Sequence, residues 1–152
     1  MSTHLDKYAA KGNEFIKLVA TGLEIPRDMA ERVTRAVFHA LRNCLSHEES
    51  FQLMAQLPMV LKGVYVDGWK YSRAFQRLKN LEDFLDEVRK EDGKMAGYDF
   101  GNNQRATEAV AAVFNAMQFF VSEGEMSDIS GMMPREIQEF IRKTLEGNNI
   151  VM

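Results

Sequence analysis

Apolar residues recur at intervals of three and four along most of the chain, which is the spacing of a helix with one buried face. The first series predicts a helix from about Leu5 to Thr21, ended by Gly22 in a left-handed cap. A second helix is expected to begin at Pro26, because proline is pre-set for the first helical turn. No segment alternates apolar and polar residues for long enough to predict a strand. The pattern therefore predicts an all-α protein.

The sequence contains an internal repeat: residues 112–141 resemble residues 36–69 at one constant offset. The residues that return unchanged are Ala36, Val37, Phe38, Ala40, Ser46, Glu49 and Pro58, as Ala112, Val113, Phe114, Ala116, Ser122, Glu125 and Pro134. We interpret the chain as one globular domain of two pseudo-symmetric repeats of about four helices, residues 1–78 and 79–152. Each repeat is expected to have an apolar face that needs the other repeat to cover it.

Both copies contain the same signals for starting a helix. Ser46 with Glu49, and Ser122 with Glu125, have the spacing of a capping box, in which serine accepts from the third amide and glutamate reaches back. Pro58 and Pro134 can each open the helix that follows. These residues are interpreted as structural.

The first copy closes with a short helix from about Pro58 to Val66, the turn Asp67-Gly68 and the single tryptophan, Trp69. We expect Trp69 to pack at the joint between the two halves. Residues 70–80 are predicted to form a linker.

The second copy carries an insertion before its central helix. Gly97, Tyr98, Phe100 and Gly101 lie in this segment, which its glycines predict to be a flexible loop and a candidate lid. The helix that follows, residues 106–121, is apolar nearly all round and is the expected seam between the halves. A last helix is predicted from Pro134 to about Glu146, ended by Gly147.

Residues 30–69 resemble the bacterial family catalogued as domain of unknown function 2267. The resemblance rests on four features: the alanine-valine-large-apolar step, the serine-glutamate cap, Gln56-Leu57-Pro58 and Gly68-Trp69. It extends more weakly over the second copy. It implies an all-helical bacterial protein with no assigned activity, cofactor or catalytic residue. Met132-Met133-Pro134 departs from the pattern, and no tryptophan closes the second copy.

Composition narrows the class of protein. A net charge of −3 argues against nucleic-acid binding through bulk charge. Cys44 is the single cysteine, which fits a reducing compartment. The first residues lack the apolar core of a signal peptide, and no apolar run is long enough for a membrane span. We therefore expect a cytoplasmic protein.

Two basic features are candidate sites for an anion or a partner. Arg32, Arg35, His39 and Arg42 form one stripe on the second helix, which can bind phosphates or be a solvated face paired with nearby acids. The solvated face is the favoured interpretation. Lys70, Arg73, Arg77 and Lys79 are interleaved with aromatic residues in the linker, an arrangement that can bind single-stranded nucleic acid. The favoured interpretation is that the acidic segment after the linker neutralises the positive charge of these residues.

Signals for catalysis, metals and cofactors are weak. Cys44, His47 and the nearby His39 are fewer cysteine and histidine ligands than a zinc site usually has. The acidic pairs of residues 82–87 lack the histidine ligands that a di-iron site in a helical bundle would need. Nucleophile elbows, Walker loops and dinucleotide fingerprints do not occur. We therefore expect neither an enzyme nor a cofactor. The ten methionines can line an adaptable groove but more often fill a core.

Three functions remain open. The first is a non-enzymatic protein–protein interaction module, with a homodimer as one form of it. The second is nucleic-acid or phosphate-ligand binding through the basic stripe and linker. The third is binding of a small apolar ligand beneath the glycine-rich loop.

Overall fold

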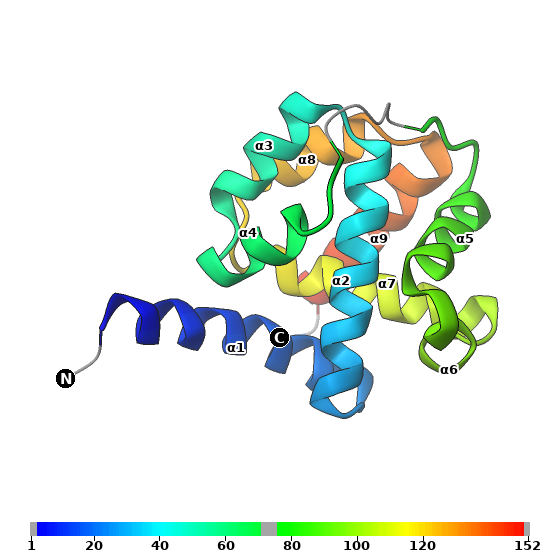
Figure 1. Ribbon diagram of the computed structural model, residues 1–152. Helices are drawn as coiled ribbons and strands as arrows, with labels where there is room; N and C mark the ends of the chain where they lie inside the picture. Colours follow the sequence, from blue (N-terminus) through cyan, green and yellow to red (C-terminus); the bar gives the residue numbers. More distant parts are fainter. Residues whose placement is uncertain (1–2, 71–75, 151–152) are drawn as a thin grey trace.

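The computed structural model describes residues 3–70 and 76–150, with side chains to residue 147. Helices account for its secondary structure, and the described residues contain no strand, so the predicted all-α class is confirmed (Figure 1). The helices are α1 (His4–Leu23), α2 (Arg27–Cys44), α3 (His47–Gln56), α4 (Met59–Val66), α5 (Leu81–Asp92), the 3-10 turn η1 (Gly93–Met95), α6 (Ala96–Asp99), α7 (Asn103–Met117), α8 (Glu123–Gly131) and α9 (Arg135–Ile150).

The helices enclose one core. Buried apolar side chains run from Phe15 on α1 to Ile141 on α9 in a single cluster. The helix pairs that join the N-terminal and C-terminal halves include α2 with α5, α6 and α7, α1 with α7, and α3 with α8. In Figure 1, α3 and α8 lie side by side, and the exposed start of α1 projects from the body. No helix in the described ranges is long and apolar enough to cross a membrane.

Helix ends differ from two of the predicted stops. The left-handed residue after α1 is Glu24, with φ of 55°, rather than Gly22, since Gly22 lies within the helix. At the other end of the chain, α9 continues through Gly147 to Ile150. The start of α1 has a capping box that the sequence analysis missed, in which Thr3 and Asp6 bond each other's amides.

The glycine-rich segment is not a loop. Residues 93–99 form η1 and α6, and Phe100 is fully buried in the core. Two arginine–carboxylate bonds hold the segment to α2, because Arg32 donates from Nε and Nη2 to the two oxygens of Asp99. Tyr98 extends into solvent, with 65% of its surface exposed. The predicted flexible loop was therefore wrong at Gly97, which lies in α6, and at the buried Phe100, whereas Gly101 lies between α6 and α7 outside either helix.

Both predicted serine caps form. The Glu49 amide donates to Ser46 Oγ and the Glu125 amide to Ser122 Oγ, each at 3.1 Å. The reverse bond, from the serine amide to the glutamate, is seen at neither Ser46 nor Ser122. The amide of Ser122 donates to Oε1 of Gln56 at 2.6 Å, which leaves the Glu125 carboxylate free to face α3.

Trp69 packs within the N-terminal half rather than at the joint between the halves. Its described ring partners are His47 and Phe51 on α3 and Tyr65 on α4, with centroid distances of 5.4, 6.1 and 5.9 Å. The guanidinium of Arg42, on α2, lies 6.0 Å from the indole centroid. Trp69 therefore closes the space between α3 and α4.

Candidate functional site

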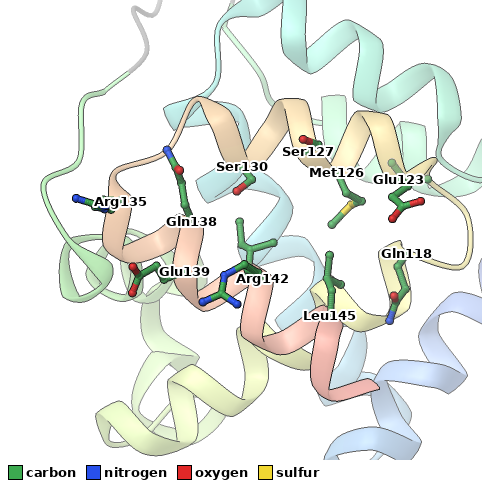
Figure 2. A pocket seen from close by; sticks show the side chains of 12 residues that line it. Gln118, Glu123, Met126, Ser127, Ser130, Arg135, Gln138, Glu139, Arg142 and Leu145 are labelled. Carbon is green, nitrogen blue, oxygen red and sulfur yellow. The ribbon is translucent and has the colours of Figure 1, made fainter. Parts of the chain in front are cut away.

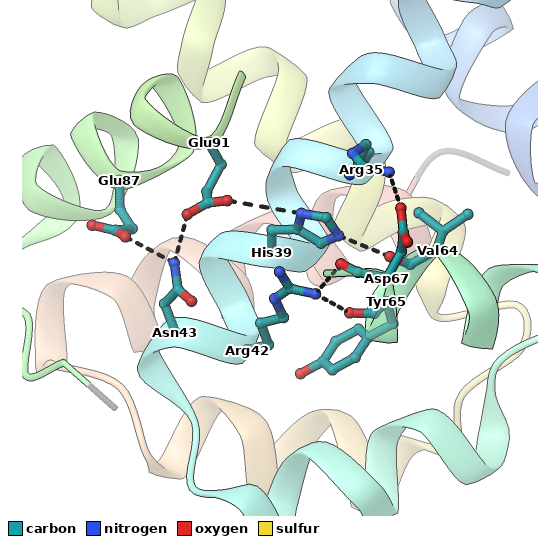
Figure 3. A network of polar contacts seen from close by, with 9 residues as sticks. All are labelled: Arg35, His39, Arg42, Asn43, Val64, Tyr65, Asp67, Glu87 and Glu91. Atoms are coloured by element: carbon teal, nitrogen blue, oxygen red, sulfur yellow. Dashed lines mark hydrogen bonds and ion pairs between the residues drawn. The ribbon is translucent and has the colours of Figure 1, made fainter. Parts of the chain in front are cut away.

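Two of the four residues of the basic stripe on α2 are buried in a polar network. His39 is 3% exposed and Arg42 is 8% exposed. Arg42 Nη1 donates to the carbonyls of Tyr65 and Asp67 at 2.8 and 2.7 Å, and Arg35 pairs with the Asp67 carboxylate at 2.8 Å (Figure 3). These cations meet the carbonyls at the end of α4, where a helix is partially negative. The interpretation as a solvated face was therefore wrong for His39 and Arg42. Arg35, which is 51% exposed and paired with Asp67, and Arg32, which also pairs with Asp28, fit that interpretation.

His39 and Asn43 extend this network to α5. The carbonyl of Val64 can only accept, so Nε2 of His39 donates to it at 2.8 Å. Burial lowers the pKa of His39, and the nearby arginines lower it further. Asn43 donates to the carboxylates of Glu87 and Glu91 at 2.9 and 2.8 Å. His39 and Arg42 thus donate to carbonyls at the end of α4, and Arg32 donates to Asp99 on α6. These bonds use donors that would otherwise be available to a phosphate.

The basic residues of the linker are not brought together with the stripe in one site. Lys70, Arg77 and Lys79 are exposed, and Arg73 lies outside the described residues. The backbone amide of Gln76 donates to the carbonyl of Asn43, which ties the far end of the linker to α2.

One acidic cluster lies between α3 and α8. Carboxylate oxygens of Glu49, Glu125 and Asp128 lie within 4.8 Å of one another, and Glu125 is 5% exposed. Burial raises the pKa of Glu125 to about 7, and the charge of Glu49 adds to the effect. Protonation of Glu125 removes the repulsion between its carboxylate and that of Glu49. The glutamates predicted as caps therefore meet where the two halves touch.

The cysteine and histidine considered as zinc ligands are used elsewhere. Cys44 is buried, and burial followed by the charge of Glu87 raises the pKa of its thiol to about 12. A thiol with this pKa stays protonated and is a poor nucleophile and a poor metal ligand. His47 stacks against Trp69.

A groove lies between α8 and α9 in the C-terminal half. Its volume is about 720 Å³, which lies within the range of ligand pockets. Its floor is apolar, because Val121, Met126 and Ile141 line it and are at most 4% exposed. In Figure 2, Met126 from α8 and Leu145 from α9 point into the space between the two helices.

The rim of the groove is polar and balanced in charge. Arg135 and Arg142 on α9 are matched by Glu139 on α9 and Glu123 on α8. Ser127 and Ser130 add small side chains along α8. An apolar floor with a neutral polar rim suits a neutral side chain or peptide better than an anion.

Of the groove residues, the sequence analysis considered only Met126, as one of the ten methionines that can line an adaptable groove. At the constant offset noted in the sequence, the residues that line the groove differ from their counterparts. The predicted candidates lie elsewhere, in the α2 network, in α6 and in the linker.

A family model described as "Uncharacterized conserved protein (DUF2267)" matches residues 12–140 of the chain. No curated protein matches it.

Proposed function

The chain belongs to the DUF2267 family, and on that premise we propose that it is a non-enzymatic protein–protein interaction module that docks its partner in the α8–α9 groove. The observation that carries the proposal is the groove itself: an open cavity of about 720 Å³ with a buried apolar floor and a polar rim. Protein interfaces have this composition, with an apolar centre and polar edges.

The proposal includes a duplication, with α1–α4 and α5–α9 as two copies of one unit. If α1 corresponds to α5, α2 to α7 and α3 to α8, then the pairing of α2 with α5 has its counterpart in the pairing of α1 with α7. The pairing of α3 with α8 is its own counterpart. Such exchange of partners is what a pseudo-twofold axis produces.

Local details support the same correspondence. Ser46 and Ser122 cap α3 and α8 with equal bond lengths. The carbonyls of Pro58 and Pro134 accept the first backbone bonds of α4 and α9 in the same pattern. On this basis one copy is closed by its own side chains, whereas the other copy keeps a groove.

Site-specific photo-crosslinking in the cells that make the protein tests the proposal. A benzophenone amino acid is placed at Glu139, on the groove rim, and at Glu82, on the exposed face of α5, as a matched control. We expect a discrete adduct with another protein from position 139 and none from position 82. Equal labelling from both positions, or adducts only with the chain itself, would overturn the proposal of a groove for a different protein.

A further inference from the structure

We propose that the α8–α9 groove takes a large aromatic side chain of the partner, held as Trp69 is held in the N-terminal half. The inference rests on the proposed function and on the correspondence of the two copies. It identifies the partner's anchor by its chemistry: a neutral aromatic ring on a segment with polar flanks.

The Trp69 site of the N-terminal half is the template. The indole lies among His47, Phe51, Tyr65 and Arg42, which come from α2, α3 and α4. The turn that brings it there requires Gly68, whose φ is 72°. Trp69 thus leaves the end of α4 and folds back over the gap between α3 and α4.

Each of these residues has a counterpart that lines the groove. At the constant offset of the two copies, Arg42, His47, Phe51, Tyr65 and Trp69 correspond to Gln118, Glu123, Ser127, Ile141 and Leu145. The burial of the counterparts agrees, because Tyr65 and Ile141 are 0% and 2% exposed. The groove therefore lies where the N-terminal half keeps its tryptophan.

The groove is open because the second copy lost side-chain volume at this place. Tryptophan is replaced by leucine, tyrosine by isoleucine, and phenylalanine by serine. The Asp67-Gly68 turn is also absent, so α9 continues as a helix through Leu145 instead of folding a ring into the gap. A ring supplied by another protein would restore the packing that Trp69 provides in the first copy.

Two features of the groove favour an aromatic ring over an aliphatic side chain. Met126 stands in the floor where the first copy has Ser50, and a thioether makes favourable contacts with aromatic rings. Arg142 at the rim, 56% exposed and paired with Glu146, can lie over a ring face as Arg42 does over Trp69. Because the rim charges balance, a charged anchor gains no net attraction.

The probe is the chain's own segment 66–70 as an acetylated and amidated peptide, titrated against the full-length protein labelled at its methionine methyl groups. Ring currents should shift the Met126 methyl resonance saturably, while that of Met95, on η1, stays in place. Replacing the peptide's tryptophan by leucine or alanine should weaken binding roughly tenfold or more, as for other buried anchors.

Two variants place a larger side chain of the protein itself in the groove. Leu145→Trp and Ser127→Phe should each weaken binding of the peptide about tenfold or more. Gln52→Phe, on the exposed face of α3, should leave binding unchanged. Melting curves check that each variant is folded, and the two groove variants serve as independent tests.

The inference is overturned if the peptide causes no saturable shift of Met126, or if the leucine peptide binds as well as the tryptophan peptide. If crosslinking from position 139 still captures a partner in that case, the interaction module stands and the aromatic anchor falls. If neither experiment shows binding, both the anchor and the proposed function are wrong.

Discussion

The indole of Trp69 meets the phenol ring of Tyr65 edge to face, with centroids 5.9 Å apart and ring planes at 82°. This arrangement is favourable for aromatic pairs beyond the area that they bury. Tyr65 is fully buried, and its hydroxyl shares a 2.7 Å hydrogen bond with Ser50. The pair therefore links α3 to α4 through the core of the N-terminal half.

Replacing Trp69 by alanine should lower the free energy of unfolding by about 2–3 kcal/mol, less than for a fully buried tryptophan because its ring is half-buried. Trp69→Phe should recover about half of the loss. Urea denaturation followed by circular dichroism measures both values. A loss below about 0.5 kcal/mol for the alanine variant would show that the ring does not hold α3 to α4.

The paired bonds between Arg32 and Asp99 give a second prediction. The Asp99 side chain is fully buried, and its pKa is lowered by Arg32 against the effect of burial. Arg32→Gln should cost about 3 kcal/mol, because it leaves a buried carboxylate unpaired beside Asp92.

The matched control for this pair is the double variant Arg32→Gln/Asp99→Asn, which removes both charges. It should be more stable than Arg32→Gln alone, as a double-mutant cycle in urea would show. Additive losses would mean that the two side chains are not coupled.

The raised pKa of Glu125, about 7, predicts a pH dependence. Its folded-state pKa lies above the usual value near 4.3, so the folded protein binds this proton more tightly than the unfolded chain does. The contribution of Glu125 to stability is therefore complete below about pH 4 and lost as the pH rises through 7.

Glu125→Gln isolates this effect, because glutamine keeps a donor toward Glu49 at every pH. The difference in unfolding free energy between variant and wild type should grow in favour of the variant from pH 5 to pH 8. Parallel curves over this range would contradict the raised pKa of Glu125. The contributions of other titrating groups, such as His39 and Asp92, cancel in this difference because both proteins contain them.

The serine caps predict equal effects in the two halves. Ser46→Ala and Ser122→Ala should each cost about 1 kcal/mol, because each removes the acceptor for one amide of the first turn. Thermal unfolding measures the two losses. Replacement by glycine should cost only a few tenths of a kcal/mol, and a larger loss for glycine than for alanine would argue against capping.

Helix positions were predictable where local rules decide them. The starts at Ser46, Pro58, Ser122 and Pro134 follow from short-range capping and proline geometry, and all four are confirmed. Helix stops were less certain, because Gly22 and Gly147 sit inside helices that tertiary packing extends past them.

Long-range contacts explain what could not be predicted. The segment from Gly97 to Gly101 has the composition of a loop, but Arg32 and the burial of Phe100 fold it. The stripe from Arg32 to Arg42 has the charge of a solvated face, yet His39 and Arg42 are buried against carbonyls at the end of α4. No local pattern encodes these partners, which lie 23 to 67 residues away.

The groove stands between these cases. No local motif marks its residues as a site. The aromatic anchor that we propose for it follows from comparing its residues with Trp69 and its neighbours at the constant offset noted in the sequence.

The most direct measurement of the central claim is the yield of the adduct formed from position 139 when the groove is filled from within. Leu145→Trp should reduce this yield at least tenfold relative to the wild-type sequence, with an unchanged melting curve, whereas Gln52→Phe should preserve it. An undiminished yield in folded Leu145→Trp protein would contradict docking in the α8–α9 groove.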